Sequence, residues 1–291
     1  MKRKDKFTIC FADITVSFRF PEAIDLPVEF EEFLVEDLSE GSGKEPDAEY
    51  EIQFLDQPLS LPASPILSYN GMQVFQTEEG TIRNYTPLTE KDGCQVACLI
   101  RESGKHTLYY PRKKWGFYSQ ELHLLHLIGI EEVMMRRNAL LLHSSVVQIG
   151  GNAILFSGPS GIGKSTQARL WEEHLDAQVV NGDRCVIRRT EEGFVGAGSP
   201  WCGTSRIYSK EQAPIKGIFI LKQSPTNSIR RLKGEAFVAL YSQCIVNTWN
   251  KEFTEQMSAL LTELISSCPV YELSCRPDTS AVELAYHTIF E

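Results

Sequence analysis

The sequence predicts an α/β protein in two parts: a β-rich N-terminal domain and a C-terminal α/β domain with a phosphate-binding loop. Short β-branched and aromatic runs fill the first part, and a helical period follows them. Strands then alternate with helices around a glycine-rich loop. We expect the β-rich domain over residues 1–117, a connecting helix over 118–142 and the α/β domain over 143–291.

The N-terminal part contains five runs typical of strands, separated by turn-forming clusters such as EGSGKEPD and EKDG. They cover residues 7–20, 48–54, 72–76, 94–102 and 106–112. Alternating runs at this spacing predict an antiparallel sheet or a small sandwich. None of them carries residues at catalytic spacing. The domain therefore either recognises an acceptor or stabilises the core, and the sequence leaves both readings open.

The segment 121–142 has a different period. Its apolar residues recur at intervals of three and four, which predicts one long amphipathic or buried helix. The β-rich part is expected to end here.

The C-terminal part alternates strands with helices. Strands are expected at 145–151 and 152–158, a helix at 164–175, and strands within 177–189 and 193–201. Helices at 234–247, 252–268 and 279–291 and a strand at 270–275 complete the pattern. A helix used as a crossover between strands is typical of an α/β domain.

Composition limits the partners of the protein. The 291 residues are 42% hydrophobic and 23% charged with a net charge of −9, which is typical of a globular chain and unfavourable for a broad nucleic-acid or anionic-membrane interface. No apolar run approaches the roughly 18–20 residues of a membrane span, and the N-terminus does not resemble a secretion signal. We expect a cytoplasmic protein with no nucleic acid or membrane partner, and a homo-oligomer stays open. The eight cysteines form no CxxC pair, so we expect reduced thiols and no zinc site.

A glycine-rich loop provides the strongest functional motif. Gly158, Gly163, Lys164 and Ser165 stand at GxxxxGK[ST] spacing between an apolar strand and a helix. Glycines let backbone N–H groups surround phosphates, the lysine neutralises them, and the serine hydroxyl can bind Mg²⁺. A turn that only begins a helix explains neither the lysine nor the serine. The motif predicts ATP and Mg²⁺ as cofactors, bound by Gly158, Pro159, Ser160, Gly161, Ile162, Gly163, Lys164, Ser165 and Thr166.

Two further residues are candidates for the site. Asp183 follows a predicted strand one helix after the loop, where a carboxylate can share Mg²⁺ with Ser165. On local grounds it could also be a turn aspartate after Asn-Gly. His143 could orient or deprotonate an acceptor hydroxyl, or be a buried histidine at a helix end.

Phosphoryl transfer also requires positive charge near the transferred group. Arg206 is our candidate for this role, with Arg230 or Arg231 as alternatives.

The run HSSVVQIGGNAILFSGPSGIGKST resembles the loop region of the HPr kinase/phosphorylase family. The family pattern has a histidine, a pair of strands and a G-x-S-G-I-G-K-S loop at the same distances. The resemblance covers roughly residues 143–205. It implies a C-terminal P-loop kinase domain of the HPr kinase and phosphoenolpyruvate carboxykinase type. The shorter HPr-kinase-like proteins of bacterial biosynthetic clusters, including lasso-peptide precursor serine kinases, resemble this chain more closely in length.

The resemblance implies roles for particular residues. His143 falls on the family's active-site histidine, Lys164 and Ser165 on its loop, and Asp183 on the second of two paired aspartates. The first aspartate, which acts on the acceptor hydroxyl, is replaced by Gly182. Asp183 itself could then be the base.

The segment SPWCGTSR, residues 199–206, stands in place of a further family motif. We expect residues 199–205 of it to form an acceptor or lid loop in which Trp201 flanks an entering peptide.

Three functions follow from this reading. The first is an ATP-dependent kinase for a serine of a peptide or small protein. The second is a kinase for a small hydroxylated metabolite such as free serine. The third is a nucleotide-binding regulator without turnover, which the loss of the first aspartate keeps open. Reverse phosphorolysis is less favoured than kinase activity.

Overall fold

Two units, Met1–Val133 and Met134–Glu291, make up the chain, and each is built on a large sheet. The computed structural model describes residues 3–35, 45–57, 59–69, 71–86, 96–114 and 128–291. The boundary falls inside the segment expected to connect the two domains. No helix in the described parts of the chain is long and apolar enough to cross a membrane.

The first unit contains a nine-stranded sheet in the order β3-β1-β2-β4-β9-β8-β7-β6-β5. Most neighbours are antiparallel, as predicted, but β4 is parallel to both β2 and β9. The elements are β1 (Arg3–Phe11), β2 (Ile14–Asp25), η1 (Val28–Phe33), β3 (Leu34–Val35), β4 (Ala48–Leu55), β5 (Leu67–Tyr69), β6 (Met72–Thr77), β7 (Gly80–Tyr85), β8 (Val96–Ile100), β9 (Lys105–Pro111) and η2 (Arg112–Lys114).

The run 7–20 forms a hairpin and not the single strand that its composition predicts. Ala12 and Asp13 form a two-residue loop with φ of 49° and 56°. Two left-handed residues in this position make the turn whose twist matches antiparallel strands. Alanine seldom adopts this conformation, and glycine or asparagine usually marks such a turn. Because neither stands here, the sequence alone does not indicate the turn.

A buried ion pair fastens the end of the first unit to its sheet. Arg83 of β7 donates from Nη1 to Glu131 Oε1 at 2.5 Å and from Nη2 to Glu132 Oε1 at 2.6 Å. The Arg83 side chain is 3% exposed and that of Glu131 is 4% exposed. Tyr50 adds a hydrogen bond of 2.6 Å from its hydroxyl to the Ile128 carbonyl. The two glutamates hold the pKa of Arg83 above its usual range although burial opposes this.

The helix predicted over 121–142 is shorter than expected. Residues 118–127 lie outside the described residues, and the described helix is α3 (Ile130–Arg136). Asn138 has a left-handed φ of 53°, and a strand begins at Ala139. The apolar run 139–142 is compatible both with a helix and with a strand that is buried on both faces. The run forms a strand because it pairs with β13.

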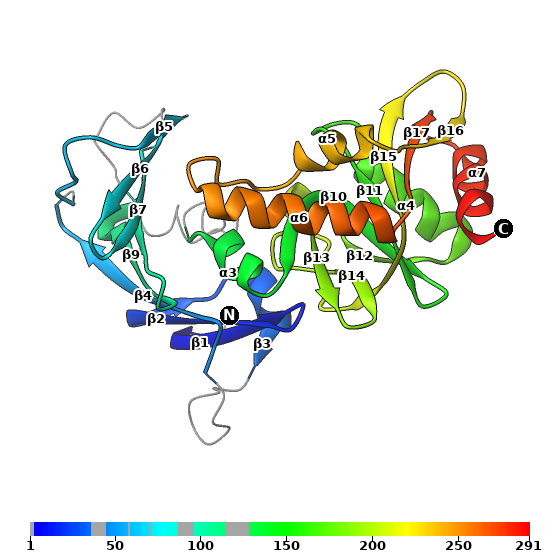
Figure 1. Cartoon of the computed structure of the whole chain (residues 1–291). Coiled ribbons are helices and arrows are strands. Elements are labelled where there is room, and N and C mark those ends of the chain that lie inside the picture. Colours follow the sequence, from blue (N-terminus) through cyan, green and yellow to red (C-terminus); the bar gives the residue numbers. More distant parts are fainter. Residues whose placement is uncertain (1–2, 36–44, 58, 70, 87–95, 115–127) are drawn as a thin grey trace. The chain divides into compact units, whose positions relative to one another are not determined.

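The second unit has eight strands and four α-helices among the described residues (Figure 1). The elements that follow α3 are β10 (Ala139–Ile149), β11 (Asn152–Ser157), α4 (Lys164–Leu175), β12 (Gln178–Asn181), β13 (Arg184–Thr190), β14 (Gly193–Ala197), η3 (Gly203–Ser205), β15 (Gln212–Gln223), β16 (Ser228–Arg231), α5 (Glu235–Tyr241), α6 (Lys251–Ser267), β17 (Val270–Cys275) and α7 (Thr279–Phe290). Strands β15 and β16 were not predicted, and α5 is shorter than expected. The predicted bounds of α4, α6, β17 and α7 agree to within a residue.

Strand β10 changes partners halfway along its length. Its first half, from Ala139 to His143, pairs antiparallel with β13. Its second half, from Ser144 on, pairs antiparallel with β11 and β12. Strands β11, β15 and β17 run parallel to one another, so their carboxyl ends meet along one edge. His143 therefore lies where β10 passes from one group of strands to the other.

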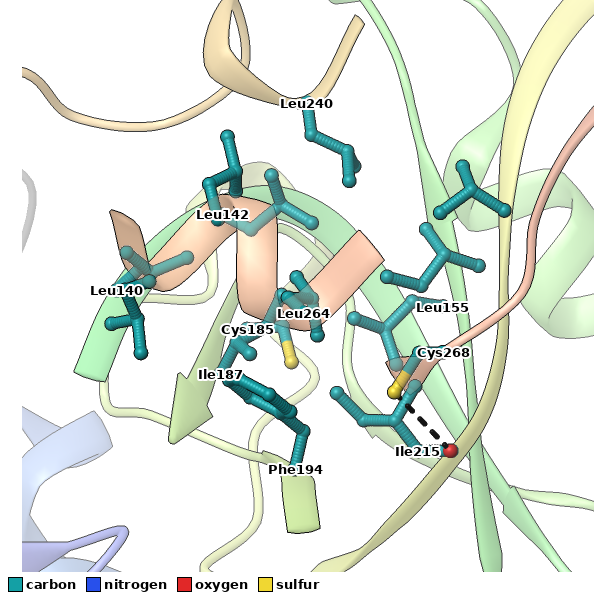
Figure 2. Packing of buried hydrophobic residues seen from close by; sticks show 14 of the residues in the cluster. Leu140, Leu142, Leu155, Cys185, Ile187, Phe194, Ile215, Leu240, Leu264 and Cys268 are labelled. Carbon is teal, nitrogen blue, oxygen red and sulfur yellow. Dashed lines mark hydrogen bonds between the residues drawn. The ribbon is translucent and has the colours of Figure 1, made fainter. Parts of the chain in front are cut away.

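Helices cover both faces of these parallel strands. On one face, α5 and α6 pack against strand residues such as Leu155 and Ile218, as part of the core seen in Figure 2. On the other face, α4 and α7 pack against residues such as Phe156 and Phe219. Successive strand residues point to opposite faces, which explains why β11 and β15 are apolar at consecutive positions.

Candidate functional site

The glycine-rich segment joins strand β11 to helix α4, as the sequence predicts. Gly158, Gly161 and Gly163 have φ of 143°, 77° and 114°, a region that residues with a Cβ rarely adopt. Apart from the adjoining residues, no heavy atom of the described chain lies within 4 Å of a Cβ built on Gly161 or Gly163. The loop backbone is thus open on that side, and Gly163 caps the first turn of a twelve-residue helix.

Lys164 points into the loop and is 6% exposed. Its Nζ donates to the carbonyl oxygens of Gly158 at 3.0 Å and Pro159 at 3.1 Å. Burial lowers the pKa of Lys164, and the charge of Asp183 partly opposes this effect. The ammonium is therefore held by neutral carbonyls in a partly desolvated position. Its electrostatic attraction to an anion is stronger there than it would be in water.

Ser165 bonds to the backbone carbonyl that directly precedes Asp183. The Ser165 hydroxyl donates to the Gly182 carbonyl at 3.2 Å, and Asp183 is the next residue. A serine hydroxyl and a carboxylate are the hard oxygen ligands that Mg²⁺ prefers. Within the described ranges no three His, Cys, Asp or Glu side chains gather as a metal site. A Mg²⁺ ion that is bound mainly by phosphates and water needs only one or two protein ligands, so this pair fits it.

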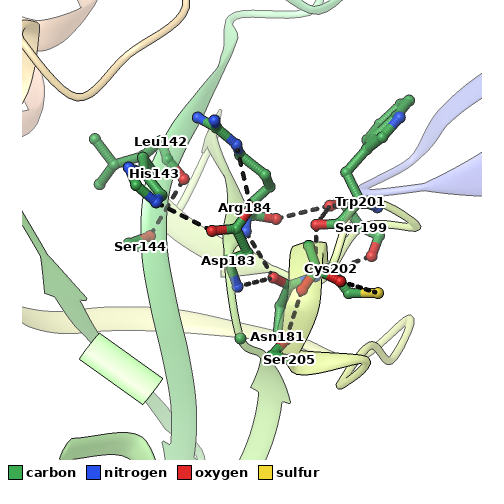
Figure 3. Close-up of polar contacts among 12 residues, drawn as sticks. Leu142, His143, Ser144, Asn181, Asp183, Arg184, Ser199, Trp201, Cys202 and Ser205 are labelled. Atoms are coloured by element: carbon green, nitrogen blue, oxygen red, sulfur yellow. Dashed lines mark hydrogen bonds and ion pairs between the residues drawn. The ribbon is translucent and has the colours of Figure 1, made fainter. Parts of the chain in front are cut away.

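His143, Asp183 and Arg184 form one polar cluster (Figure 3). His143 Nε2 lies 3.0 Å from Asp183 Oδ1, and Arg184 Nε lies 3.5 Å from Asp183 Oδ2. His143 and Arg184 are directly opposed on β10 and β13. Burial alone would raise the pKa of Asp183, but the hydrogen bond from His143 and the charges of Arg184 and Lys164 outweigh it. The pKa of Asp183 is lowered, so its carboxylate is ionised at neutral pH.

The cluster adjoins the beginning of the loop because β10 and β11 are paired. Ser144 is the register partner of Ser157, the last residue before Gly158. The Ser157 hydroxyl also donates to the His143 carbonyl at 3.0 Å. The predicted pair of strands thus places His143 next to the loop.

Asn181 organises the site and was missed from the sequence. Its Oδ1 accepts from the backbone N–H groups of Asp183 and Arg184, each at 2.8 Å, and its Nδ2 donates to the Ser199 carbonyl at 2.9 Å (Figure 3). The side chain is fully buried. The only signal was the Asn-Gly-Asp turn itself, in which asparagine commonly binds its own backbone two residues on.

Gly182 is a close-approach position. A Cβ at Gly182 would lie 2.2 Å from Ser205 Oγ and 2.5 Å from Ser205 Cβ. The Ser205 hydroxyl is itself fixed by donating to the Cys202 carbonyl at 2.5 Å. Ser205 therefore fills the space where a side chain at position 182 would begin, which gives a physical reason for glycine here.

Arg184, which was not among the predicted arginines, forms an ion pair with Asp183. Arg206 is exposed, with a left-handed φ of 56° just after η3. Arg230 is exposed and pairs with Glu235 and Glu272. Arg184 pairs with Asp183, and burial lowers the pKa of Arg184 while the charge of Asp183 opposes the shift. The sequence signal was its place directly after Asp183.

The segment 199–206 lies against Asp183, but Trp201 does not have the expected exposure. A Cβ at Gly203 would lie 2.8 Å from Asp183 Cγ, so the backbone of η3 packs on the carboxylate. Trp201 is fully buried, so as placed it offers no surface to an entering peptide. Its expected role as a flank for the acceptor is therefore wrong for this conformation.

Comparisons with known proteins add little to this geometry. No protein-family model and no curated protein matches the chain. One solved structure that matches is the Hpr(Ser) kinase/phosphatase from Coxiella burnetii. The match has 12% identity and a TM-score of 0.31, and it covers 51% of this chain and 89% of that chain. At these values the match assigns neither a fold family nor a function.

Proposed function

We propose that the protein is a magnesium-dependent kinase that transfers the γ-phosphate of ATP to a serine hydroxyl of a peptide or small protein. The observation that carries this proposal is the assembly of the loop lysine with the His143–Asp183 pair at one end of β11. A binding loop alone requires no oriented histidine. A transferase requires a group that can take the proton of an acceptor hydroxyl.

The loop and its cation would hold the phosphates. Backbone N–H groups of the loop and the N-terminus of α4 favour anions, and Lys164 would exchange its two loop carbonyls for phosphate oxygens. Ser165 and Asp183 would hold Mg²⁺, which neutralises charge on the phosphates. Arg184 is the cation beside Asp183 that could stabilise charge on the transferred group.

His143 is the proposed base. Because the carboxylate of Asp183 is ionised, a hydrogen bond between Asp183 Oδ1 and His143 Nε2 requires the proton on Nε2. The neutral imidazole then has its lone pair on Nδ1. The acceptor hydroxyl would lose its proton to Nδ1 while its oxygen bonds to the γ-phosphorus and the bond to the β-phosphate oxygen breaks, releasing ADP. This assignment replaces the base that the family pattern places at position 182.

The experiment measures ADP release from Mg-ATP by the purified chain, with serine peptides, small serine-containing proteins and free serine as acceptors. Lys164→Ala should abolish acceptor-dependent release, whereas Lys222→Ala, on the exposed surface of β15, should leave it unchanged. His143→Gln should lower turnover by about 10²–10⁴-fold with little change in nucleotide affinity. His174→Gln on α4 is the control, because this histidine is exposed and its Nε2 pairs with Thr279 Oγ1 and not with Asp183.

The acceptor panel also decides between substrate classes. Turnover with free serine but with no peptide would replace the peptide kinase by a metabolite kinase. Loss of nucleotide binding in His143→Gln would contradict its role as a base. Equal ADP release by Lys164→Ala and the unchanged protein would refute the proposal.

A nucleotide-binding regulator is the second candidate, and one observation favours it. The segment 199–206 packs with Gly203 on Asp183 and Ser205 on Gly182, at the side of the site where an acceptor would approach. Tight ATP binding with no turnover for any acceptor would support this candidate.

A further inference from the structure

A cavity opens beside the glycine-rich loop, away from the His143–Asp183 pair. Its volume is about 540 Å³. The loop segment 161–163 and Gln167 of α4 line one side, and Ser224 after β15 and Cys275 at the end of β17 line another. Open parallel sheets bind ligands outside the carboxyl ends of their strands. This cavity occupies that position between β15, β17 and the loop that follows β11.

Gln167, which lines the cavity, has one buried polar atom without a partner among the described residues. Gln167 is 2% exposed, and its Nε2 donates to Cys275 Sγ at 3.3 Å. Its Oε1 has no hydrogen-bond partner among the residues that the structure describes. Leaving a buried acceptor unsatisfied costs about 1–3 kcal/mol. A ligand in the cavity that donates a hydrogen bond to this atom, once the Gln167 amide turns toward the cavity, would remove this cost.

The rest of the lining suits a flat, partly apolar group. Ile162 and Leu221 provide apolar walls, and Gln223 and Arg276 provide polar groups at the margin. A cavity with apolar walls and few fixed polar groups is typical of a site for a small organic ligand.

The start of α4 sets the direction of a ligand in the loop. Ser165 bonds to the carbonyl of Gly182 on the Asp183 side, whereas the next residue, Thr166, lines the cavity. Successive helix residues are about 100° apart around the axis. Phosphates in the loop would therefore have Asp183 at one end and the cavity at the other, so a group attached to the far end of the phosphate chain would enter the cavity.

We infer that this cavity holds the nucleoside of a bound nucleoside triphosphate, and that Gln167 Oε1 accepts a hydrogen bond from it. The inference rests on the proposed function, because it requires the phosphates to lie in the loop. It assigns recognition of the nucleoside to a cavity formed by the ends of β15 and β17 together with Gln167.

The test compares ATP with inorganic tripolyphosphate, which carries the phosphates without the nucleoside, by calorimetric titration in the presence of Mg²⁺. The unchanged protein should bind ATP at least about tenfold more tightly than tripolyphosphate. Gln167→Leu should weaken ATP binding by about tenfold and leave tripolyphosphate binding unchanged. Its melting temperature should be equal or higher, since an unsatisfied buried acceptor is removed.

A second variant tests the cavity itself. Ser224→Trp fills the cavity from its margin and should lower the affinity for ATP to that for tripolyphosphate. Ser228→Trp, on exposed β16 outside the cavity lining, is the matched control and should bind both as the unchanged protein does.

The outcomes separate the two proposals. If the unchanged protein binds neither ATP nor tripolyphosphate, the phosphate-binding role of the loop is refuted. Equal affinities for ATP and tripolyphosphate, or an unchanged affinity ratio in Ser224→Trp, would overturn the nucleoside inference and leave the loop proposal standing. If Gln167→Leu unfolds, Ser224→Trp decides alone.

Discussion

Replacing Gly182 with alanine should destabilise the protein, because the new methyl group would overlap Ser205. The added Cβ would lie 2.2 Å from Ser205 Oγ and 2.5 Å from Ser205 Cβ, both well inside van der Waals contact. The hydroxyl is anchored to the Cys202 carbonyl, so it moves only with loss of that bond. Overpacking of this kind costs about 1–3 kcal/mol.

Ser205→Gly removes both atoms that would clash. By itself it should destabilise by about 0.5–1.5 kcal/mol through the lost hydrogen bond to Cys202. In this background Gly182→Ala should be neutral or stabilising by about 0.4–1 kcal/mol, since φ at Gly182 is not left-handed and alanine restricts the unfolded chain. The two substitutions should therefore be coupled favourably by about 1–4 kcal/mol.

Urea unfolding of the full chain measures this coupling through tryptophan fluorescence. Three of the four tryptophans, Trp171, Trp201 and Trp249, belong to the second unit, so the signal reports mainly on it. The single variants, the double variant and the unchanged protein complete a cycle. A Gly182→Ala protein as stable as the unchanged one, or an equal loss in both backgrounds, would refute the role given to Ser205.

Two further predictions concern charged groups. Glu131→Leu leaves the buried Arg83 without one of its carboxylates and should destabilise by about 3–5 kcal/mol in thermal or urea unfolding; removal of Glu79, an exposed partner of Arg101, should change stability by less than about 1 kcal/mol. An effect of Glu131→Leu no larger than that of the Glu79 variant would contradict the buried pair. Asp183 has a lowered pKa in the folded chain, so its ionised form stabilises the fold above its ordinary pKa of 3.8, and this contribution is lost as pH falls through the lowered value. The difference in unfolding free energy between the unchanged protein and Asp183→Asn should accordingly shrink on acidification. A difference that grows below pH about 4 would show that the pKa of Asp183 is raised and not lowered.

The sequence by itself determined the local parts of the candidate site. The strand before the loop, the glycine positions and the helix from Lys164 to Leu175 follow one another directly in the chain, so their signals need no distant partner. His143 lies next to the loop because a hairpin of two adjacent strands connects them. Asp183 follows the loop by one helix and one strand, so its position is also set locally.

Tertiary structure decided what depends on residues far apart in the chain. Residues 139–142 form a strand because they pair with β13. A short apolar run by itself does not distinguish a strand from a helix. The place of Arg184 beside the His143–Asp183 pair follows from the register of β10 against β13, which puts Arg184 opposite His143.

Two contacts show most clearly what the sequence alone does not predict. Ser205 occupies the space that a side chain at position 182 would need. In the wall of the proposed nucleoside cavity, Gln167 bonds to Cys275, 108 positions later in the chain. Neither pair carries a sequence pattern, because packing depends on the distance between atoms and not on their separation along the chain. The sequence therefore specified the loop and its chemical groups, and only the folded chain specified what surrounds them.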